Sequence, residues 1–90
     1  MGFILSLTGI DDNGADIAWD EIDGAKLYRV YWADKNTQTM QYKLMSEQEN
    51  CSYHLKKSTH VPHFIYVEAV TDAGIVKSEL LRTPLKRVLK

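Results

Sequence analysis

The residues of this chain that could do chemistry are scattered and do not form a catalytic set. The 90 residues include one cysteine, three histidines and twelve acidic side chains. Asp20, Glu21 and Asp23 fall together, but they occupy one predicted turn, where turn formation explains them. No second carboxylate is predicted across a cleft from them, so the sequence indicates no acid–base pair. The five glycines are spread along the chain and form no phosphate-binding loop.

The cysteine and the histidines indicate neither a nucleophile nor a metal site. Cys51 lies in an alternating segment and is predicted to be an inert core thiol, with His54 on the opposite face of that strand. His60 and His63 are three residues apart, but Pro62 excludes a helix and no neighbouring ligand completes a tetrahedral set. We therefore expect no catalytic residue, no metal and no cofactor, and we do not expect an enzyme.

The composition is that of one small globular domain. Hydrophobic residues make up 44% and charged residues 26% of the chain, values that suit a single folded core. A formal net charge of −1 gives no bulk attraction to nucleic acid or to an anionic membrane. No apolar run approaches the roughly 18–20 residues that cross a bilayer. We expect neither nucleic acid nor membrane as a partner.

Short alternating segments separated by turn residues predict an all-β protein. Turn signals recur roughly every 8–12 residues, which is typical of a sandwich. The predicted strands are residues 3–8, 15–19, 27–32, 40–45, 51–55, 63–70 and 75–82. Residues 34–39 and 46–50 are predicted to be loops. In the strand 40–45, Tyr42 and Leu44 are expected to face the core.

A hairpin from residue 15 to residue 32 organises the rest of the predicted core. Its two strands each carry a large aromatic residue, Trp19 and Tyr28, on the side that should face inward. The apolar run at 63–70 should place Ile65 and Val67 opposite them. The predicted core anchors are Trp19, Tyr28, Val30, Trp32, Ile65 and Val67.

The spacing of these residues resembles the fibronectin type III domain. The matching segments are Ile17-Ala18-Trp19, Gly24-Ala25 with Tyr28 and Val30-Tyr31-Trp32, the run from Ile65 to Gly74, Ser78, and Thr83-Pro84. The resemblance covers residues 3–84 and implies a seven-stranded antiparallel immunoglobulin-like sandwich, strands A, B and E against C′, C, F and G. Residues 85–90 are expected to be a basic C-terminal tail or linker.

Two positions depart from the pattern of that family. The family has a tyrosine in strand F whose hydroxyl bonds back to the E–F loop, and here that position is His63, whose imidazole can make a similar bond. The family's integrin-binding tripeptide is absent, because the F–G loop reads Asp72-Ala73-Gly74. Integrin binding through that motif is therefore not expected.

The topology implied by the resemblance defines one candidate binding face. It makes 27–32 and 63–70 neighbouring strands, with Arg29, Tyr31, Phe64 and Tyr66 pointing outward. Tyr31 and Tyr66 would lie side by side. Such a patch can stack on sugar rings, contact a protein, or simply stabilise the sheet as a cross-strand pair.

The sequence is also similar to bacterial versions of the domain, which often accompany secreted carbohydrate-active enzymes and surface proteins. The resemblance implies a non-catalytic spacer or docking module in a longer protein, extracellular or at the cell surface. Its expected partners are the neighbouring domains of the same polypeptide, and the module itself is expected to be a monomer. The alternative is a ligand-binding module that uses the aromatic face for a glycan or a protein.

Overall fold

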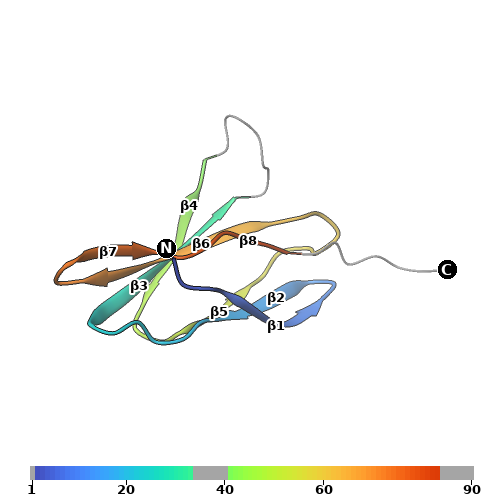
Figure 1. Cartoon of the computed structure of the whole chain (residues 1–90). Helices are drawn as coiled ribbons and strands as arrows, with labels where there is room; N and C mark the ends of the chain where they lie inside the picture. Colours follow the sequence, from blue (N-terminus) through green and yellow to red (C-terminus); the bar gives the residue numbers. More distant parts are fainter. Residues whose placement is uncertain (1, 34–40, 84–90) are drawn as a thin grey trace.

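The chain forms two antiparallel β-sheets that pack face to face (Figure 1). The computed structural model describes residues 2–33 and 41–83, and all regular structure in these ranges is β-strand. The strands are β1 (Ser6–Asp11), β2 (Gly14–Ala18), β3 (Ala25–Ala33), β4 (Lys43–Gln48), β5 (Ser52–Leu55), β6 (Phe64–Thr71), β7 (Gly74–Lys77) and β8 (Leu81–Arg82). The predicted loop at 34–39 and the predicted tail at 85–90 lie outside the described residues.

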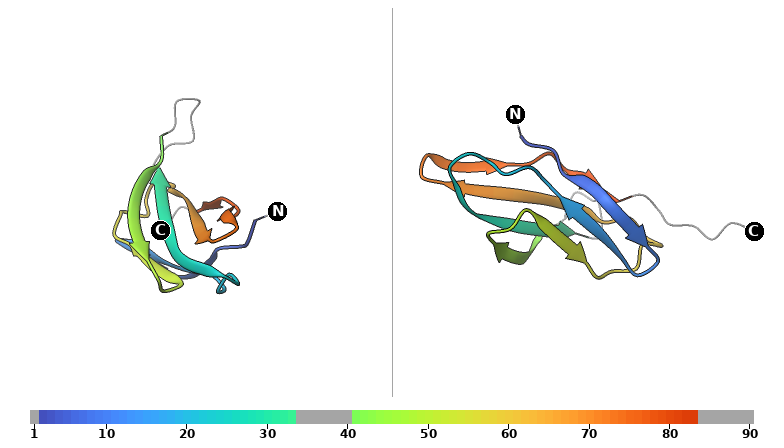
Figure 2. Two further views of the ribbon diagram at one scale, coloured as in Figure 1. Left: turned by 90° about the vertical axis from the view of Figure 1, so that its left-hand side faces the viewer. Right: turned by 90° about the horizontal axis from the view of Figure 1, so that it is seen from below.

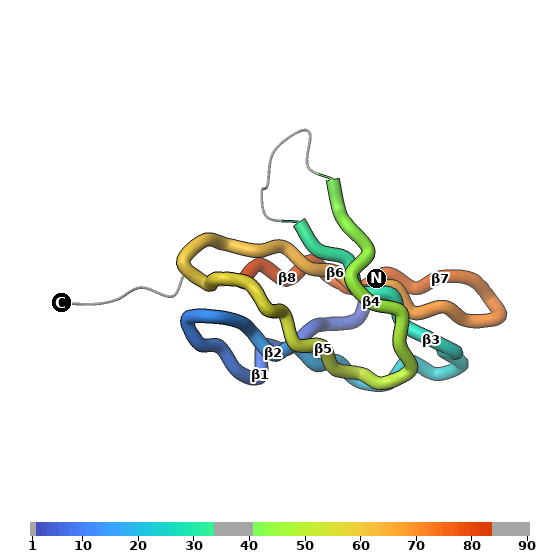
Figure 3. The backbone as a smooth tube through the Cα atoms, turned by 180° about the vertical axis from the view of Figure 1, so that it is seen from behind, coloured from blue at the N-terminus to red at the C-terminus, as the bar shows by residue number. Residues whose placement is uncertain are grey.

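The sheet order is the one that the sequence resemblance implied. One sheet has the order β1-β2-β5, and the other has the order β4-β3-β6-β7 with β8 also paired to β6. Figure 2 shows the two layers from two further directions, and Figure 3 shows the chain passing from β4 in one sheet to β5 in the other. The predicted all-β sandwich is confirmed, with eight strands in place of seven.

The extra strand arises because the predicted strand 75–82 is interrupted at Ser78. The Ser78 amide donates to the Val67 carbonyl at 2.8 Å, and the Val67 amide donates to Ser78 Oγ at 2.8 Å. A side-chain hydroxyl thus takes the place of a ladder carbonyl, and the regular pairing stops. Pairing resumes at β8, opposite Phe64 and Ile65.

The fourth strand differs most from its prediction. It runs from Lys43 to Gln48, so residues predicted to be a loop are strand. Leu44 pairs with Tyr31, and directly opposed residues share one face of a sheet. The expectation that Leu44 faces inward was therefore wrong: it lies on the outer face and is 47% exposed.

The inner faces of the sheets form a continuous hydrophobic core. Alternate positions of β3 and β6 meet the inner residues of β2 and β5, as the alternation of strand side chains requires. The buried residues of this core are Leu5, Ile17, Trp19, Tyr28, Val30, Leu55, Ile65, Val67 and Ala69. Burying one such aliphatic side chain contributes about 1.5–3 kcal/mol, so the core is the main source of stability.

Trp32 is the predicted core anchor that is not enclosed. It packs against the core only partly. Its indole Nε1 donates to His63 Nδ1 at 3.1 Å, and Lys57 Nζ lies 4.4 Å from the centroid of a Trp32 ring. Trp32 thus contacts a polar residue, His63, and a charged residue, Lys57, at the margin of the sandwich. A partly buried position is typical of a tryptophan with such neighbours.

Trp19 and Tyr28 form the aromatic centre of the core. Their ring centroids are 5.6 Å apart in an edge-to-face arrangement with an interplanar angle of 63°. The Tyr28 hydroxyl accepts a hydrogen bond from the Ile22 amide at 2.9 Å, which ties the β2–β3 connection to the core. That connection turns at Gly24, whose φ of 82° favours glycine.

His63 takes the role that the resemblance assigns to a tyrosine. Its side chain is buried, with Nε2 2.6 Å from the Ser58 carbonyl in the β5–β6 loop. Since Nδ1 accepts from Trp32 Nε1, the proton of the neutral ring is on Nε2, which donates to Ser58. The His63 backbone also exchanges two 2.9 Å bonds with Thr83, one of them through the Thr83 hydroxyl. One residue thus joins the loop, β3 and the end of the described chain.

Trp19→Ala should lower the free energy of unfolding by about 3–5 kcal/mol, because it removes the largest side chain of the core. Urea unfolding followed by circular dichroism measures the change. Val61→Ala is the control, since Val61 is exposed and its loss should cost less than about 0.5 kcal/mol. An unchanged urea midpoint for Trp19→Ala would contradict the core assignment.

His63→Leu should destabilise the domain by about 2–3 kcal/mol, because it leaves the Ser58 carbonyl and the Trp32 indole N–H without partners. Thermal and urea unfolding measure the loss. His60→Leu is the matched control, as His60 is exposed and its Nε2 lies 3.9 Å from Asp12 Oδ1. Equal effects of the two substitutions would show that the His63 contacts do not stabilise the fold.

Candidate functional site

Tyr31 and Tyr66 lie side by side on the outer face of the larger sheet. They are cross-strand partners on β3 and β6. Their rings are stacked, with centroids 4.8 Å apart and an interplanar angle of 15°. Both side chains are half-buried. The two tyrosines form the centre of what we call the tyrosine face, which also includes Arg29, Tyr42 and Lys77.

Phe64 does not belong to this face as a contact residue. The sequence predicted it to be exposed, but it is only 4% exposed. Its neighbours in the sheet are Ala33 of β3 on one side and Arg82 of β8 on the other. Phe64 is therefore buried, and the prediction that its side chain is exposed was wrong.

Tyr42 and Lys77 complete the cluster, and the sequence argument missed both. The Tyr42 ring packs against Tyr66 edge to face, with centroids 4.8 Å apart and an interplanar angle of 71°. Lys77 Nζ lies 4.2 Å from the centroid of the Tyr66 ring. Lys77 is on the partner strand of β6 and pairs with Glu68, so correct pairing of the last hairpin could have revealed it. Tyr42 was expected to face inward, but it packs on Tyr66 at the outer face, so that expectation was wrong.

A row of alternating charges crosses the sheet beside the tyrosines. Glu47, Arg29, Glu68 and Lys77 are successive cross-strand partners on β4, β3, β6 and β7. Arg29 Nε lies 2.8 Å from Glu47 Oε2, and this hydrogen bond raises the pKa of Arg29. Opposite charges that face each other across strands favour the pairing only modestly, because solvent screens exposed charges. The row is formally neutral and follows the register that the sheet pairing gives it.

The three tyrosines keep their protons at neutral pH. Burial raises the pKa of Tyr42, and it is also the main cause of the raised pKa of Tyr31 and Tyr66. Glu68 adds to the effect on Tyr31 by a hydrogen bond and to that on Tyr66 by its charge. Neutral phenols donate and accept hydrogen bonds but serve neither as bases nor as nucleophiles.

The arrangement of the rings limits what the tyrosine face can bind. Tyr31 and Lys77 come from the strands on either side of β6, so they approach Tyr66 from opposite sides. Tyr42 packs against it as well. Stacking of a sugar needs a free aromatic ring face, and Tyr66 offers none.

The other candidate groups form no chemical site in the described part of the chain. Between residues 2–33 and 41–83, no three His, Cys, Asp or Glu side chains gather in a way that could hold a metal ion. Asp16 and His54 pair at 2.5 Å on an open surface. Cys51 is partly buried and packs against the core. Within those same ranges, no helix is long and apolar enough to cross a bilayer.

Comparison with known proteins shows a shared fold. No family model and no curated protein matches the sequence. The sixth fibronectin type III domain of a human fibronectin type III domain containing protein matches with a TM-score of 0.74 and 18% identity, over 99% of this chain and 89% of that one. The chain therefore has the fibronectin type III fold, as its sequence predicted.

Two further matches are parts of longer chains. The pectate lyase PelI from Erwinia chrysanthemi, solved with tetragalacturonic acid, matches with a TM-score of 0.72 and 13% identity over 92% of this chain. The twitchin kinase region from C. elegans matches with a TM-score of 0.63 and 9% identity over 93% of this chain. The matched part spans 28% of the pectate lyase and 16% of the twitchin region. Identities this low establish the fold and not a shared activity.

Tyr66→Phe should make the domain less sensitive to alkaline pH. Folding raises the pKa of Tyr66, so the folded state favours the neutral phenol. That stabilisation is fully present below about pH 10, the ordinary tyrosine value, and is lost as pH rises through the raised value. The variant cannot ionise there, so its stability relative to the natural chain should increase in alkaline buffer.

Urea unfolding of both proteins across the range from neutral to strongly alkaline pH measures this difference. Lysines titrate in the same range, but they are common to both proteins and cancel in the comparison. A stability difference that stays constant with pH would show that Tyr66 ionises equally in the folded and unfolded states.

Proposed function

We propose that the chain is a non-catalytic module that spaces or docks domains within a longer protein. That longer protein lies outside the cell or at the cell surface of a bacterium and acts on a carbohydrate. The module's partners are then the neighbouring domains of the same polypeptide. The module itself acts as a monomer and contributes rigidity or a docking surface in place of reacting groups.

The match to part of a pectate lyase carries this proposal. In that protein the same fold occupies 28% of a chain whose name describes a carbohydrate-active enzyme. The twitchin kinase region likewise contains the fold as a fraction of an enzyme chain. A spacer needs a stably folded core, and the enclosed interior of the sandwich is consistent with that role.

The tyrosine face supports a second candidate function, the binding of a protein. Tyrosine and arginine, both present on this face, are enriched in protein interfaces. The occupied ring faces of Tyr66 make a stacked sugar a poorer fit than a protein surface. If the bound protein is a neighbouring domain of the same polypeptide, the docking role and the protein-binding role are the same.

A spacer can be tested by placing the 90-residue chain between two fluorescent proteins. Energy transfer between them should stay constant with added urea until the domain unfolds, then change cooperatively. Trp19→Ala in the same fusion should shift that transition to lower urea. A gradual change from the first addition of urea would mean that the module is not a rigid spacer.

The absence of catalysis is tested on the isolated chain. We expect no release of reducing ends from pectin, xylan or cellulose. The non-catalytic assignment would be overturned if the natural chain released reducing ends and Trp19→Ala, whose core is destabilised, did not.

A further inference from the structure

His63 is a buried titratable side chain whose two ring nitrogens both have partners. The residue is only 3% exposed. Nδ1 accepts the indole proton of Trp32 at 3.1 Å, and Nε2 donates to the Ser58 carbonyl, 2.6 Å away. A neutral imidazole has one donor and one acceptor, so these two bonds use its whole capacity. The site is therefore built for the neutral ring.

A proton taken up by His63 would turn its accepting nitrogen into a donor. The imidazolium carries a proton on both nitrogens, so Nδ1–H and the indole N–H of Trp32 would point at each other. The bond to the Ser58 carbonyl would persist, because Nε2 donates in both forms. The contact that acid breaks is therefore the one between His63 and Trp32.

The groups around the imidazole do not compensate for a positive charge. The β5–β6 loop contributes Lys57, whose Nζ lies 4.4 Å from the centroid of a Trp32 ring. Thr83 bonds the His63 backbone, and Arg82 of β8 pairs with the residue that follows His63. Lys57 and Arg82 are cations, and within residues 2–33 and 41–83 no carboxylate forms an ion pair with His63. A buried charge without a counter-ion is unfavourable, so a proton on this ring favours an arrangement that opens the site to water.

Trp32 is the side chain that can move in response, because it packs against the core only partly. The other inner residues of β3, Tyr28 and Val30, are buried. The Trp32 and His63 rings lie with their centroids 5.9 Å apart and tilted by 39°, so they do not interlock as a tight stack. The indole can therefore turn toward solvent while the rest of the strand keeps its place in the sheet.

We propose that the Trp32–His63 contact is an acid-sensitive switch. At neutral pH the indole is bonded to the imidazole. When a proton from the solvent binds Nδ1 of His63, that bond is lost and the Trp32 side chain is released to the surface. The switch is separate from the tyrosine face and does not rest on the spacer role.

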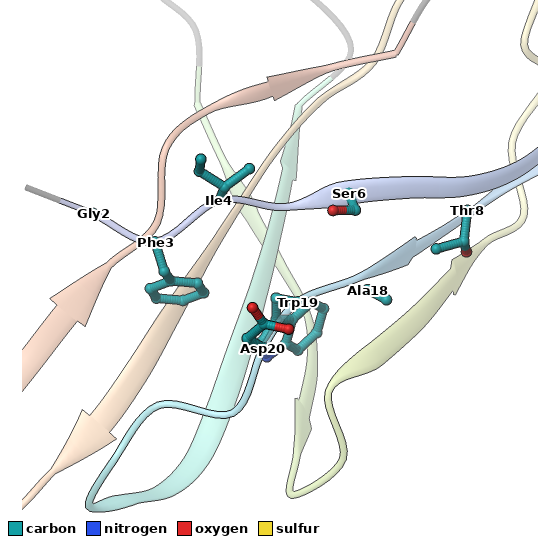
Figure 4. A pocket seen from close by; sticks show the side chains of 8 residues that line it. All are labelled: Gly2, Phe3, Ile4, Ser6, Thr8, Ala18, Trp19 and Asp20. Atoms are coloured by element: carbon teal, nitrogen blue, oxygen red, sulfur yellow. The ribbon is translucent and has the colours of Figure 1, made fainter.

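Trp19 provides an internal reference for a test on the folded chain. It lines an open groove of about 540 Å³ beyond the last pair between β1 and β2, which joins Ser6 to Ala18 (Figure 4). Its Nε1 is buried and has no hydrogen-bond partner, so no titrating group is bonded to it. An effect specific to His63 should change the indole signal of Trp32 and leave that of Trp19 in place.

NMR of ¹⁵N-labelled protein follows both indole signals from about pH 7.5 to about pH 5, a range that covers histidine and stays above ordinary aspartate titration. The Trp32 indole proton should move upfield as its hydrogen bond is lost, and the Trp19 signal should stay. His63→Gln keeps one acceptor and one donor without titrating, so its Trp32 signal should not move. His60→Gln is the matched control and should behave like the natural chain, since His60 is exposed.

The NMR result overturns the proposal in three cases. The first is a Trp32 signal that does not move in this range. The second is movement of both indole signals together, which indicates global unfolding. The third is movement of the Trp32 signal that persists in His63→Gln.

Trp32→Phe supplies a second readout, because it removes the indole donor and keeps an aromatic ring. A histidine in the unfolded chain binds a proton below about pH 6.5, whereas the folded site disfavours it, so stability is present above that pH and is lost as pH falls. The urea midpoint of the natural chain should therefore fall between about pH 7.5 and about pH 5, and it should fall less in Trp32→Phe. Equal falls in the two proteins would show that the indole does not make the site acid-sensitive and would overturn the proposal.

Discussion

The structure depends on one strand, β6, which lies inside the larger sheet and forms the floor of the core. Its inner residues Ile65, Val67 and Ala69 are completely enclosed. On one side β6 pairs with nearly all of β3, and on the other it pairs with β7 and then β8. Because a strand alternates its side chains, enclosing these three residues also fixes which residues face outward. The position of Tyr66 on the outer face is thus a consequence of core packing.

The tyrosine face and the groove beside Trp19 have different physical origins. The tyrosine face is a product of regular pairing: each ring or charge is matched by a neighbour on the next strand, which stabilises the sheet and leaves few groups unsatisfied. The groove beside Trp19 arises where pairing fails, since the first residues of the chain leave the smaller sheet. Among the described residues, the indole N–H of Trp19 is buried without a hydrogen-bond partner, and the tyrosine face has no comparable group in that part of the chain.

Strand alternation and turn residues were sufficient to predict an all-β chain and most of its core, because both depend on local pattern. The sheet order was implied by the resemblance to the fibronectin type III domain. Leu44 and Phe64 were assigned wrongly, since their exposure depends on the register of β4 and on the extra pairing of β8. The interruption at Ser78 depends on one side-chain hydrogen bond, which no pattern of apolar residues reveals. The path of residues 2–5, which precede β1 and bond to Glu79 between β7 and β8, differs from the predicted first strand at 3–8.

Amide hydrogen exchange in the native state tests the central role of β6 most directly. If β6 and its partner β3 form the last structure to open, the amides of Val30, Ile65, Val67 and Ala69 should exchange only through global unfolding. Their exchange free energies should then equal the free energy of unfolding from urea. The account is contradicted if these amides exchange through smaller openings while amides of β1 or β4 remain protected up to global unfolding.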